Sequence, residues 1–139
     1  MSTPVHTGFP VEKGFMKLRL RHNSIRLRLL KGEVDSFRET GFVAEEIIFP
    51  DGRKFTYAIE RNDAIERPEA RLAESRVTIL VPKADADVWT ETDEVGIRYD
   101  IGCGNGIELR VVIEKDFVCI DRKDDPDNAD AFPNPTAKC

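Results

Sequence analysis

The chain has 139 residues, of which 40% are hydrophobic and 34% are charged, and its formal net charge is −5. This length suits one domain with one core, and the composition is ordinary for a soluble globular protein. A globally acidic chain is a poor generic binder of nucleic acid, and no apolar run is long enough for a membrane-spanning helix.

The charge is unevenly distributed along the chain. Residues 1–62 hold 11 Lys/Arg and 8 Asp/Glu (11 − 8 = +3), whereas residues 63–139 hold 10 and 18 (10 − 18 = −8). The two halves could attract each other inside one fold, or they could drive a head-to-tail homo-oligomer. Three widely spaced cysteines do not suggest a disulfide framework, and no secretory signal is visible at the start. We therefore expect a cytoplasmic protein with no membrane partner.

The first residues predict a lead-in followed by a basic hairpin. Residues 1–14 have little periodicity, which favours a flexible lead-in, and Met16 could serve as an alternative translation start. Apolar and basic residues then alternate over 15–20 and 25–29, with a short polar join at 21–24. This pattern predicts two antiparallel strands. Five basic residues are expected on the solvent face of this hairpin: Lys17, Arg19, Arg21, Arg26 and Arg28.

A short helix and a second hairpin are predicted next. Val34 and Phe37 lie three residues apart, which places them on one face of a helix over 33–40 that ends at Gly41. Strands are expected over 42–49 and 54–60, joined by a Pro-Asp-Gly turn. The polar residues 62–75 then bridge to the second half and include a short strand over 71–73.

The second half predicts the same sequence of elements. A strand over 77–81 leads into a helix whose buried side we expect to be Ala84, Val88 and Trp89. Strands over 95–101 and 107–113 form another long hairpin. Five aspartates among residues 121–130 predict a solvated acidic tail. We expect Phe132 to anchor that tail in a surface groove or on a neighbouring subunit.

An internal repeat connects the two halves. A shift of 52 positions places Trp89 on Phe37 and gives five identities over 25 positions, where chance would give roughly one or two. Beyond the Pro-Asp-Gly turn the shift becomes 54 and places Glu114 on Glu60. We therefore predict one mainly β, α+β domain over residues 15–120. Two pseudo-symmetric ββαββ repeats, residues 15–62 and 70–117, form one barrel-like sheet with two short helices, and residues 121–139 form the tail.

Several motifs point away from catalysis and metal binding. Gly102-x-Gly104-x-Gly106 superficially resembles a phosphate loop, but an alternating strand follows it, so a hairpin turn is the better interpretation. His6 and His22 are the only histidines, and no Cys-x-x-Cys is present, so a zinc site is not expected. Cys119 has no visible activating base and is interpreted as structural. We predict no catalytic residue, no metal and no cofactor.

Two sets of residues remain as candidate binding sites. Glu60 and Glu114 recur in the two repeats and could meet near the pseudo-twofold axis, where close carboxylates can hold a divalent ion. The alternative is that they are strand-end residues paired with basic neighbours. Arg19, Arg26 and Arg28 could bind an anion from the basic hairpin, or they could pair across the sheet with the acidic second half.

Three segments carry a resemblance to a known family. They are MKLRLRHNSIRLRL at 16–29, EKDFVC at 114–119 and AFPNP at 131–135. With them, residues 16 to 135 resemble a family of small uncharacterised bacterial proteins, a domain of unknown function, which implies no activity. RVTILVPK at 76–83 is also similar to the strand-into-helix signature of cradle-loop barrels, which include DNA-binding regulators, although Asp85 and Asp87 follow where such regulators are often less acidic.

Three classes of function are compatible with these features. The preferred one is a non-enzymatic binding or interaction module whose partner is unknown. The second is a metal-dependent enzyme on a phosphate-rich substrate that uses Glu60 and Glu114. The third is a nucleic-acid-binding regulator that uses the basic hairpin 17–28, although nucleic acid is not the expected partner of so acidic a chain.

Overall fold

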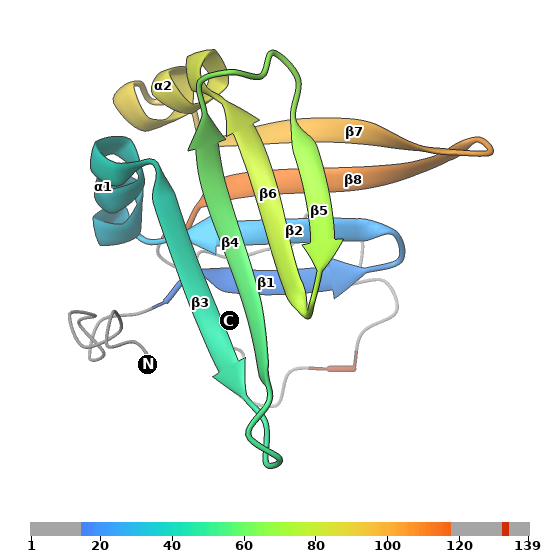
Figure 1. Ribbon diagram of the computed structural model, residues 1–139. Coiled ribbons are helices and arrows are strands. Elements are labelled where there is room, and N and C mark those ends of the chain that lie inside the picture. Colours follow the sequence, from blue (N-terminus) through green and yellow to red (C-terminus); the bar gives the residue numbers. More distant parts are fainter. Residues whose placement is uncertain (1–14, 118–131, 134–139) are drawn as a thin grey trace.

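The computed structural model describes residues 15–117 and 132–133 (Figure 1). The described part contains the order ββαββ twice. The first five elements are β1 Lys17–Arg21, β2 Ser24–Leu29, α1 Lys31–Thr40, β3 Phe42–Ile48 and β4 Lys54–Asn62. The next five are β5 Glu69–Ala73, β6 Arg76–Pro82, α2 Lys83–Glu91, β7 Gly96–Gly104 and β8 Ile107–Lys115. The predicted mainly β, α+β fold with two short helices is confirmed.

The strands form two four-stranded sheets, and each sheet takes strands from both halves of the chain. Sheet A has the order β1-β2-β8-β7 and sheet B has the order β3-β4-β6-β5. The central pairs β2–β8 and β4–β6 are parallel, and the outer pairs are antiparallel. Exchanging the halves converts one order into the other, so the architecture is pseudo-symmetric. Figure 1 shows the strands of sheet B crossing in front of those of sheet A.

The structure refines the expectation of one barrel-like sheet. Sheet A ends at the edge strands β1 and β7, and sheet B ends at β3 and β5. In a closed barrel every strand has two hydrogen-bonded neighbours. Within the described part, each of these four edge strands has only one. The fold is therefore two open sheets that face each other. The β3–β4 and β7–β8 hairpins extend past the crossing in Figure 1.

Alternating side chains place one apolar face of each sheet in a shared core. Successive strand residues point to opposite faces, so residues two apart share a face. In sheet A this face carries Leu27, Leu29, Val111 and Ile113, all at most 1% exposed. In sheet B it carries Tyr57, Ile59, Ile79 and Val81. The opposite face of each sheet is turned away from the core and is called its outer face below.

The first helix follows its sequence signals closely. Val34 and Phe37 are its buried residues, as predicted. Gly41 ends the helix with φ = +77°, a left-handed conformation that glycine adopts at little cost. A side chain at Gly41 would also meet the guanidinium group of Arg61 at 3.2 Å. The predicted end of the helix is therefore confirmed.

The second helix buries a different face from the one expected. Its buried residues are Ala86, Trp89 and Thr90, whereas Ala84 and Val88 are exposed, with Val88 at 53%. Steps of three and four residues share a helix face, and 86, 89 and 90 follow that spacing. Residues 84 and 88 lie on the opposite side, so the prediction for Ala84 and Val88 is wrong and that for Trp89 is right.

Phe37 and Trp89 join the two helices at the core. Both are 0% exposed, and their ring centroids lie 6.1 Å apart at an interplanar angle of 64°. This edge-to-face geometry is favourable because the positive edge of one ring meets the negative face of the other. The two residues that the repeat aligns are therefore both buried anchors, although an origin by duplication stays a prediction.

The long hairpins turn where glycine was expected. Gly52 has φ = +87°, and its N–H donates to the Phe49 carbonyl at 2.8 Å. Asn105 and Gly106 have φ = +56° and +75°, as a two-residue hairpin turn requires. The glycine-rich segment is thus a hairpin turn rather than a phosphate loop.

Of the predicted tail, only Phe132 and Pro133 lie among the described residues. Phe132 is 96% exposed, so it does not pack into a groove of its own chain. The expected anchor is wrong in that form, because an aromatic ring this exposed gains almost nothing from burial. The aspartates and Cys119 lie outside the described residues.

Candidate functional site

Four of the five predicted site residues lie on the outer face of sheet A. Arg26 and Arg28 alternate with the buried Leu27 and Leu29 on β2, so they point away from the core. Arg19 of β1 is opposite Arg26, and Glu114 of β8 is opposite Arg28. Three strands, β1 and β2 from one end of the described chain and β8 from the other, therefore build one charged surface.

Glu114 is held between two arginines. Its Oε1 lies 3.1 Å from Nε of Arg28 and 3.8 Å from Nε of Arg26. About a fifth of the Glu114 and Arg28 side chains is exposed, so water screens this pair less than a fully solvated one. Lys17 likewise pairs with Asp116 at 2.9 Å. The expected pairing of the basic hairpin with the acidic second half is confirmed at these positions.

Positive charge exceeds negative charge on the outer face of sheet A. Its basic residues are Lys17, Arg19, Arg21, Arg26, Arg28, Arg98 and Arg110, and its acidic residues are Asp100, Glu108 and Glu114. Seven charges against three leave +4 on one face of a chain whose total is −5. Ion pairs within the face therefore neutralise only part of it. This surface is called the basic face below.

Arg98 and Arg110 belong to the basic face but were not predicted. Both alternate with core residues of β7 and β8, and Arg98 shares a register position with Val112, which is opposite Arg26. Val112 is only 6% exposed although it lies on the outer face. The alternation was visible in the sequence. The parallel pairing of β2 with β8 had no local signal, because it joins segments about 85 residues apart.

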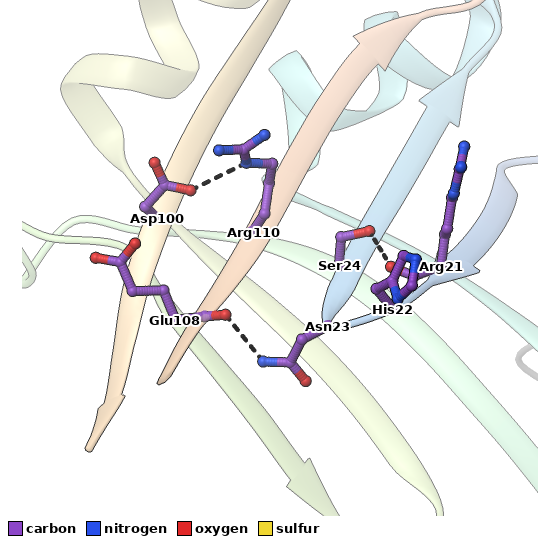
Figure 2. A pocket seen from close by; sticks show the side chains of 7 residues that line it. All are labelled: Arg21, His22, Asn23, Ser24, Asp100, Glu108 and Arg110. Carbon is purple, nitrogen blue, oxygen red and sulfur yellow. Dashed lines mark hydrogen bonds and ion pairs between the residues drawn. The ribbon is translucent and has the colours of Figure 1, made fainter. Parts of the chain in front are cut away.

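A shallow polar hollow marks one end of the basic face (Figure 2). It is lined by Arg21, His22, Asn23, Ser24, Asp100, Glu108 and Arg110. Asn23 donates from Nδ2 to the Glu108 carbonyl at 2.9 Å, and the Arg110 N–H donates to the Asn23 carbonyl at 3.1 Å. Nε of Arg110 also lies 3.1 Å from Oδ1 of Asp100. These contacts fix the β1–β2 turn against β8 and leave both charge signs around the hollow.

The structure does not bring Glu60 to Glu114. Glu60 lies on β4 of sheet B and Glu114 on β8 of sheet A, and each alternates with a core isoleucine, so each is on an outer face. The neighbours of Glu60 across the sheet are Phe42 and Leu80. Among residues 15–117 and 132–133, no group of three or more His, Cys, Asp or Glu is placed to hold a metal ion.

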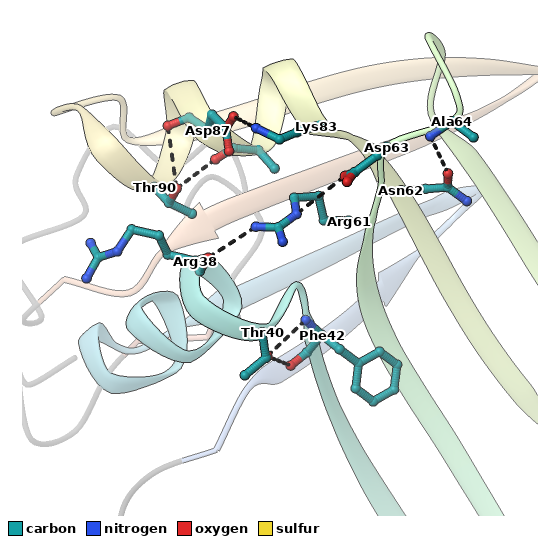
Figure 3. Close-up of polar contacts among 11 residues, drawn as sticks. Arg38, Thr40, Phe42, Arg61, Asn62, Asp63, Ala64, Lys83, Asp87 and Thr90 are labelled. Atoms are coloured by element: carbon teal, nitrogen blue, oxygen red, sulfur yellow. Dashed lines mark hydrogen bonds and ion pairs between the residues drawn. The ribbon is translucent and has the colours of Figure 1, made fainter.

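The basic residues that follow these glutamates serve the helix ends. Arg61 donates from Nη1 to the Arg38 carbonyl at 3.1 Å, in the last turn of α1 (Figure 3). Its Nε lies 3.7 Å from Oδ1 of Asp63. Lys115 donates to the Thr92 carbonyl, at the end of α2, at 2.8 Å. Cations stabilise helix C-termini because unpaired carbonyls concentrate negative charge there. Arg61 and Lys115 thus recur in the two halves because each binds the C-terminal end of a helix.

A second cluster of carboxylates lies at the start of β1. Burial raises the pKa of Glu33, and burial followed by the nearby Glu33 charge raises the pKa of Glu45 to about 7. Hydrogen bonds with the Met16 backbone oppose both shifts in pKa. The hydroxyl of Tyr57 donates to the Met16 carbonyl at 2.7 Å. These side chains come from α1, β3 and β4 and converge on one backbone position.

The equivalent place in the second half has a different pair. Asp85 of α2 takes the position of Glu33 in α1. The strand register places Tyr99 where Glu45 lies, because Glu45 is opposite Tyr57 and Tyr99 is opposite the equivalent Val111. The Tyr99 hydroxyl donates to Oδ2 of Asp85 at 2.7 Å. Burial, followed by this bond, raises the pKa of Tyr99. In the second half, the neutral Tyr99 phenol donates a hydrogen bond to the Asp85 carboxylate. In the first half, both side chains, Glu33 and Glu45, are carboxylates. Sequence reasoning did not single out Glu33, Glu45 or Tyr99.

The fold and the basic face define the chain as a mainly β, α+β protein with a charged sheet surface. The described part has no helix long and apolar enough to cross a membrane. The model of a family of unknown function (DUF7009) matches residues 16–136, so the chain belongs to that family, as the resemblance predicted. Comparison with curated proteins gives no match. The similarity to cradle-loop barrels stays a prediction.

Proposed function

We propose that the protein is a non-enzymatic binding module and that the basic face of sheet A binds an acidic segment of a partner protein. The observation that carries the proposal is the excess of seven basic over three acidic side chains on that face. A local field of this kind attracts an anionic partner even when the net charge is negative.

The side chains of the basic face favour protein over single-stranded nucleic acid. Proteins that bind single strands usually stack bases on aromatic rings. The outer positions of β1, β2, β7 and β8 carry no Phe, Tyr or Trp.

Ordering of the arginines supports binding at this face. Arg28 and Arg26 are held by one carboxylate, so less side-chain entropy is lost when a partner arrives. Arg98 on the edge strand β7 and Arg110 on the central strand β8 come from the second half of the chain. The face therefore presents guanidinium groups from both halves, and these can form bidentate bonds with carboxylates.

The test compares two matched triple variants. Arg19→Gln/Arg26→Gln/Arg98→Gln removes three charges from the basic face, and Lys54→Gln/Arg71→Gln/Arg76→Gln removes three from the outer face of sheet B. Binding to poly-L-glutamate, a DNA duplex and polyphosphate is measured by fluorescence anisotropy at several salt concentrations. We expect the first triple to weaken polyglutamate binding at least tenfold, and the second to leave it within about twofold of wild type.

Three results would contradict the proposal. They are equal losses in both triples, no binding of polyglutamate at low salt, and tighter binding of the duplex than of polyglutamate. The last result would support a nucleic-acid regulator instead. Thermal melting of each variant shows whether a loss of binding reflects a loss of folding.

A further inference from the structure

The outer positions of sheet A form rows that cross its strands. Residues paired on neighbouring strands lie side by side, about 4.8 Å apart, and successive outer positions along one strand are about 6.7 Å apart. One row, called the central row below, contains Arg19 of β1, Arg26 of β2, Val112 of β8 and Arg98 of β7. One flanking row is Lys17, Arg28, Glu114 and Gly96, and the other is Arg21, Ser24, Arg110 and Asp100.

Most of the net positive charge of the basic face lies in the central row. This row has three arginines and no acidic residue. Each flanking row has two basic residues and one acidic residue, which leaves one positive charge, and Glu108 beyond the rows adds one negative charge. The central row therefore supplies three of the four net positive charges of the face, on a line at right angles to the strands.

Acidic residues on the basic face compensate the flanking rows more than the central row. Oε1 of Glu114 lies 3.1 Å from Nε of Arg28 but 3.8 Å from Nε of Arg26. Oδ1 of Asp100 lies 3.1 Å from Nε of Arg110, as Figure 2 shows. These flanking arginines already have carboxylates as hydrogen-bond partners, so the carboxylates of a binding partner gain less from them than from the central row.

We propose that the central row selects the partner of the basic face, and that the partner's acidic segment is extended and lies across the strands. This geometry rests on the binding role proposed above for the basic face. From β1 to β7 the row covers three strand spacings, about 14 Å, and Arg19 and Arg98 at its ends are exposed. In an extended segment alternate side chains share a face, and three of them cover about 13 Å. Carboxylates at every second residue therefore match the row.

A segment added to an edge of sheet A would not make these contacts. Strand addition pairs a peptide with β1 or β7 and aligns it with the strands, so its side chains pass the central row once and then face the flanking rows. A segment at right angles to the strands meets all three arginines. Val112 is 6% exposed and uncharged, so the partner residue over it needs no carboxylate.

The first test compares two double variants with the same change in charge. Arg19→Gln/Arg98→Gln removes two arginines from the central row, and Arg28→Gln/Arg110→Gln removes one from each flanking row. The charge of the face falls by two in both, so attraction by net charge alone predicts equal losses. We expect the first double to weaken binding of poly-L-glutamate at low salt at least tenfold, and the second to weaken it by less than about threefold. Thermal melting checks the folding of each variant.

The second test uses the wild-type chain and two peptides of the same composition. Their sequences are Ser-Glu-Ser-Glu-Ser-Glu-Ser and Ser-Ser-Glu-Glu-Glu-Ser-Ser, with acetylated and amidated ends that carry no charge. Only the first places three carboxylates on one side of an extended chain. We expect it to bind at least threefold more tightly in NMR titrations at low salt. Its largest chemical-shift changes should fall on Arg19, Arg26 and Arg98.

The outcomes separate the geometry of binding from binding itself. Equal losses in the two double variants, or equal affinity for the two peptides, would overturn the geometry and leave the basic face as a binding surface. Chemical-shift changes confined to β1 or to β7 would also overturn it, because they indicate a segment aligned with one edge. If neither polyglutamate nor the peptides bind the wild type at low salt, the binding role proposed above fails, and the geometry fails with it.

Discussion

The two sheets share one inner pattern but have different outer faces. On the inner faces, Ile59 and Ile79 of sheet B take the places of Ile113 and Leu27 of sheet A, and all are at most 1% exposed. On the outer face of sheet A, seven basic residues oppose three acidic ones. Sheet B has three of each sign: Lys54, Arg71, Arg76, Glu46, Glu60 and Glu69.

One equivalent pair of positions shows how the outer faces differ. Glu114 has Arg28 and Gly96 as cross-strand neighbours, whereas Glu60 has Leu80 and Phe42. Arg76 on sheet B is directed to an aromatic ring, with its guanidinium carbon 5.6 Å from the Phe42 centroid. Packing constrains the inner positions, so most of them stay alike, and Glu45 with its counterpart Tyr99 is an exception. The outer positions are free to differ, and the charged face is therefore where a binding role would lie.

The largest effect should come from the equivalent core anchors. Trp89→Ala and Phe37→Ala should each lower the free energy of unfolding by about 3–5 kcal/mol, because each leaves a cavity beside the other ring. Denaturant unfolding followed by circular dichroism measures both. A loss below about 1 kcal/mol for one of them would show that the two halves do not carry the core equally.

The next effect should come from the carboxylate pair that the second half lacks. In the chain of 139 residues, burial and Glu33 raise the folded-state pKa of Glu45 to about 7, above its ordinary value of 4.5. The folded state therefore binds the proton more tightly than the unfolded state. Proton binding at Glu45 therefore stabilises the folded state. This stabilisation is fully present below pH 4.5 and is lost as the pH rises through 7.

Glu45→Gln should flatten the pH dependence that this carboxyl causes. At pH 8 the variant should be more stable than the wild type by about 1–2 kcal/mol, less than the full shift would give because Glu45 is partly solvated. Denaturant unfolding at pH 4.5, 6 and 8 measures the slope. Tyr99→Phe at the equivalent position is the control, since its phenol stays neutral over this range. An unchanged slope for Glu45→Gln would exclude this carboxyl as the cause.

The smallest effect should distinguish the two outer faces. Glu114→Gln leaves two arginines close together without their shared carboxylate, so it should cost about 1 kcal/mol. Glu60→Gln should change stability by less than about 0.5 kcal/mol, because nothing in the described part forms an ion pair with Glu60. Equal costs at low salt would mean that the ion pairs of sheet A contribute nothing specific.

Local signals in the sequence were sufficient for most of the fold. The period of two defined the strands around Leu27 and Ile59, and Gly41 marked the end of α1. The repeat placed Phe37 and Trp89 in equivalent positions. Ala84 and Val88 were misplaced because a helix with few apolar residues allows more than one buried face, and only packing against Phe37 selects that of Trp89.

The candidate site was only half predictable, because its assembly depends on pairing between distant strands. The arginines of the first hairpin were evident from alternation, and so was the possibility that acidic partners lie in the second half. The position of Glu114 beside Arg28 required the parallel pairing of β2 with β8. Glu45 was missed because its inward direction follows the register of β3, where a carboxylate replaces the expected apolar residue.

The exchange of strands between the halves has a consequence for synthesis on the ribosome. All four strands of sheet B lie between Phe42 and Pro82, so they are complete when little more than half of the chain has been made. The first hairpin is made earlier still, but its neighbour β8 ends only at Lys115. A nascent chain therefore carries β1 and β2 without their sheet, and the basic face exists only once both ends of the described fold have left the ribosome.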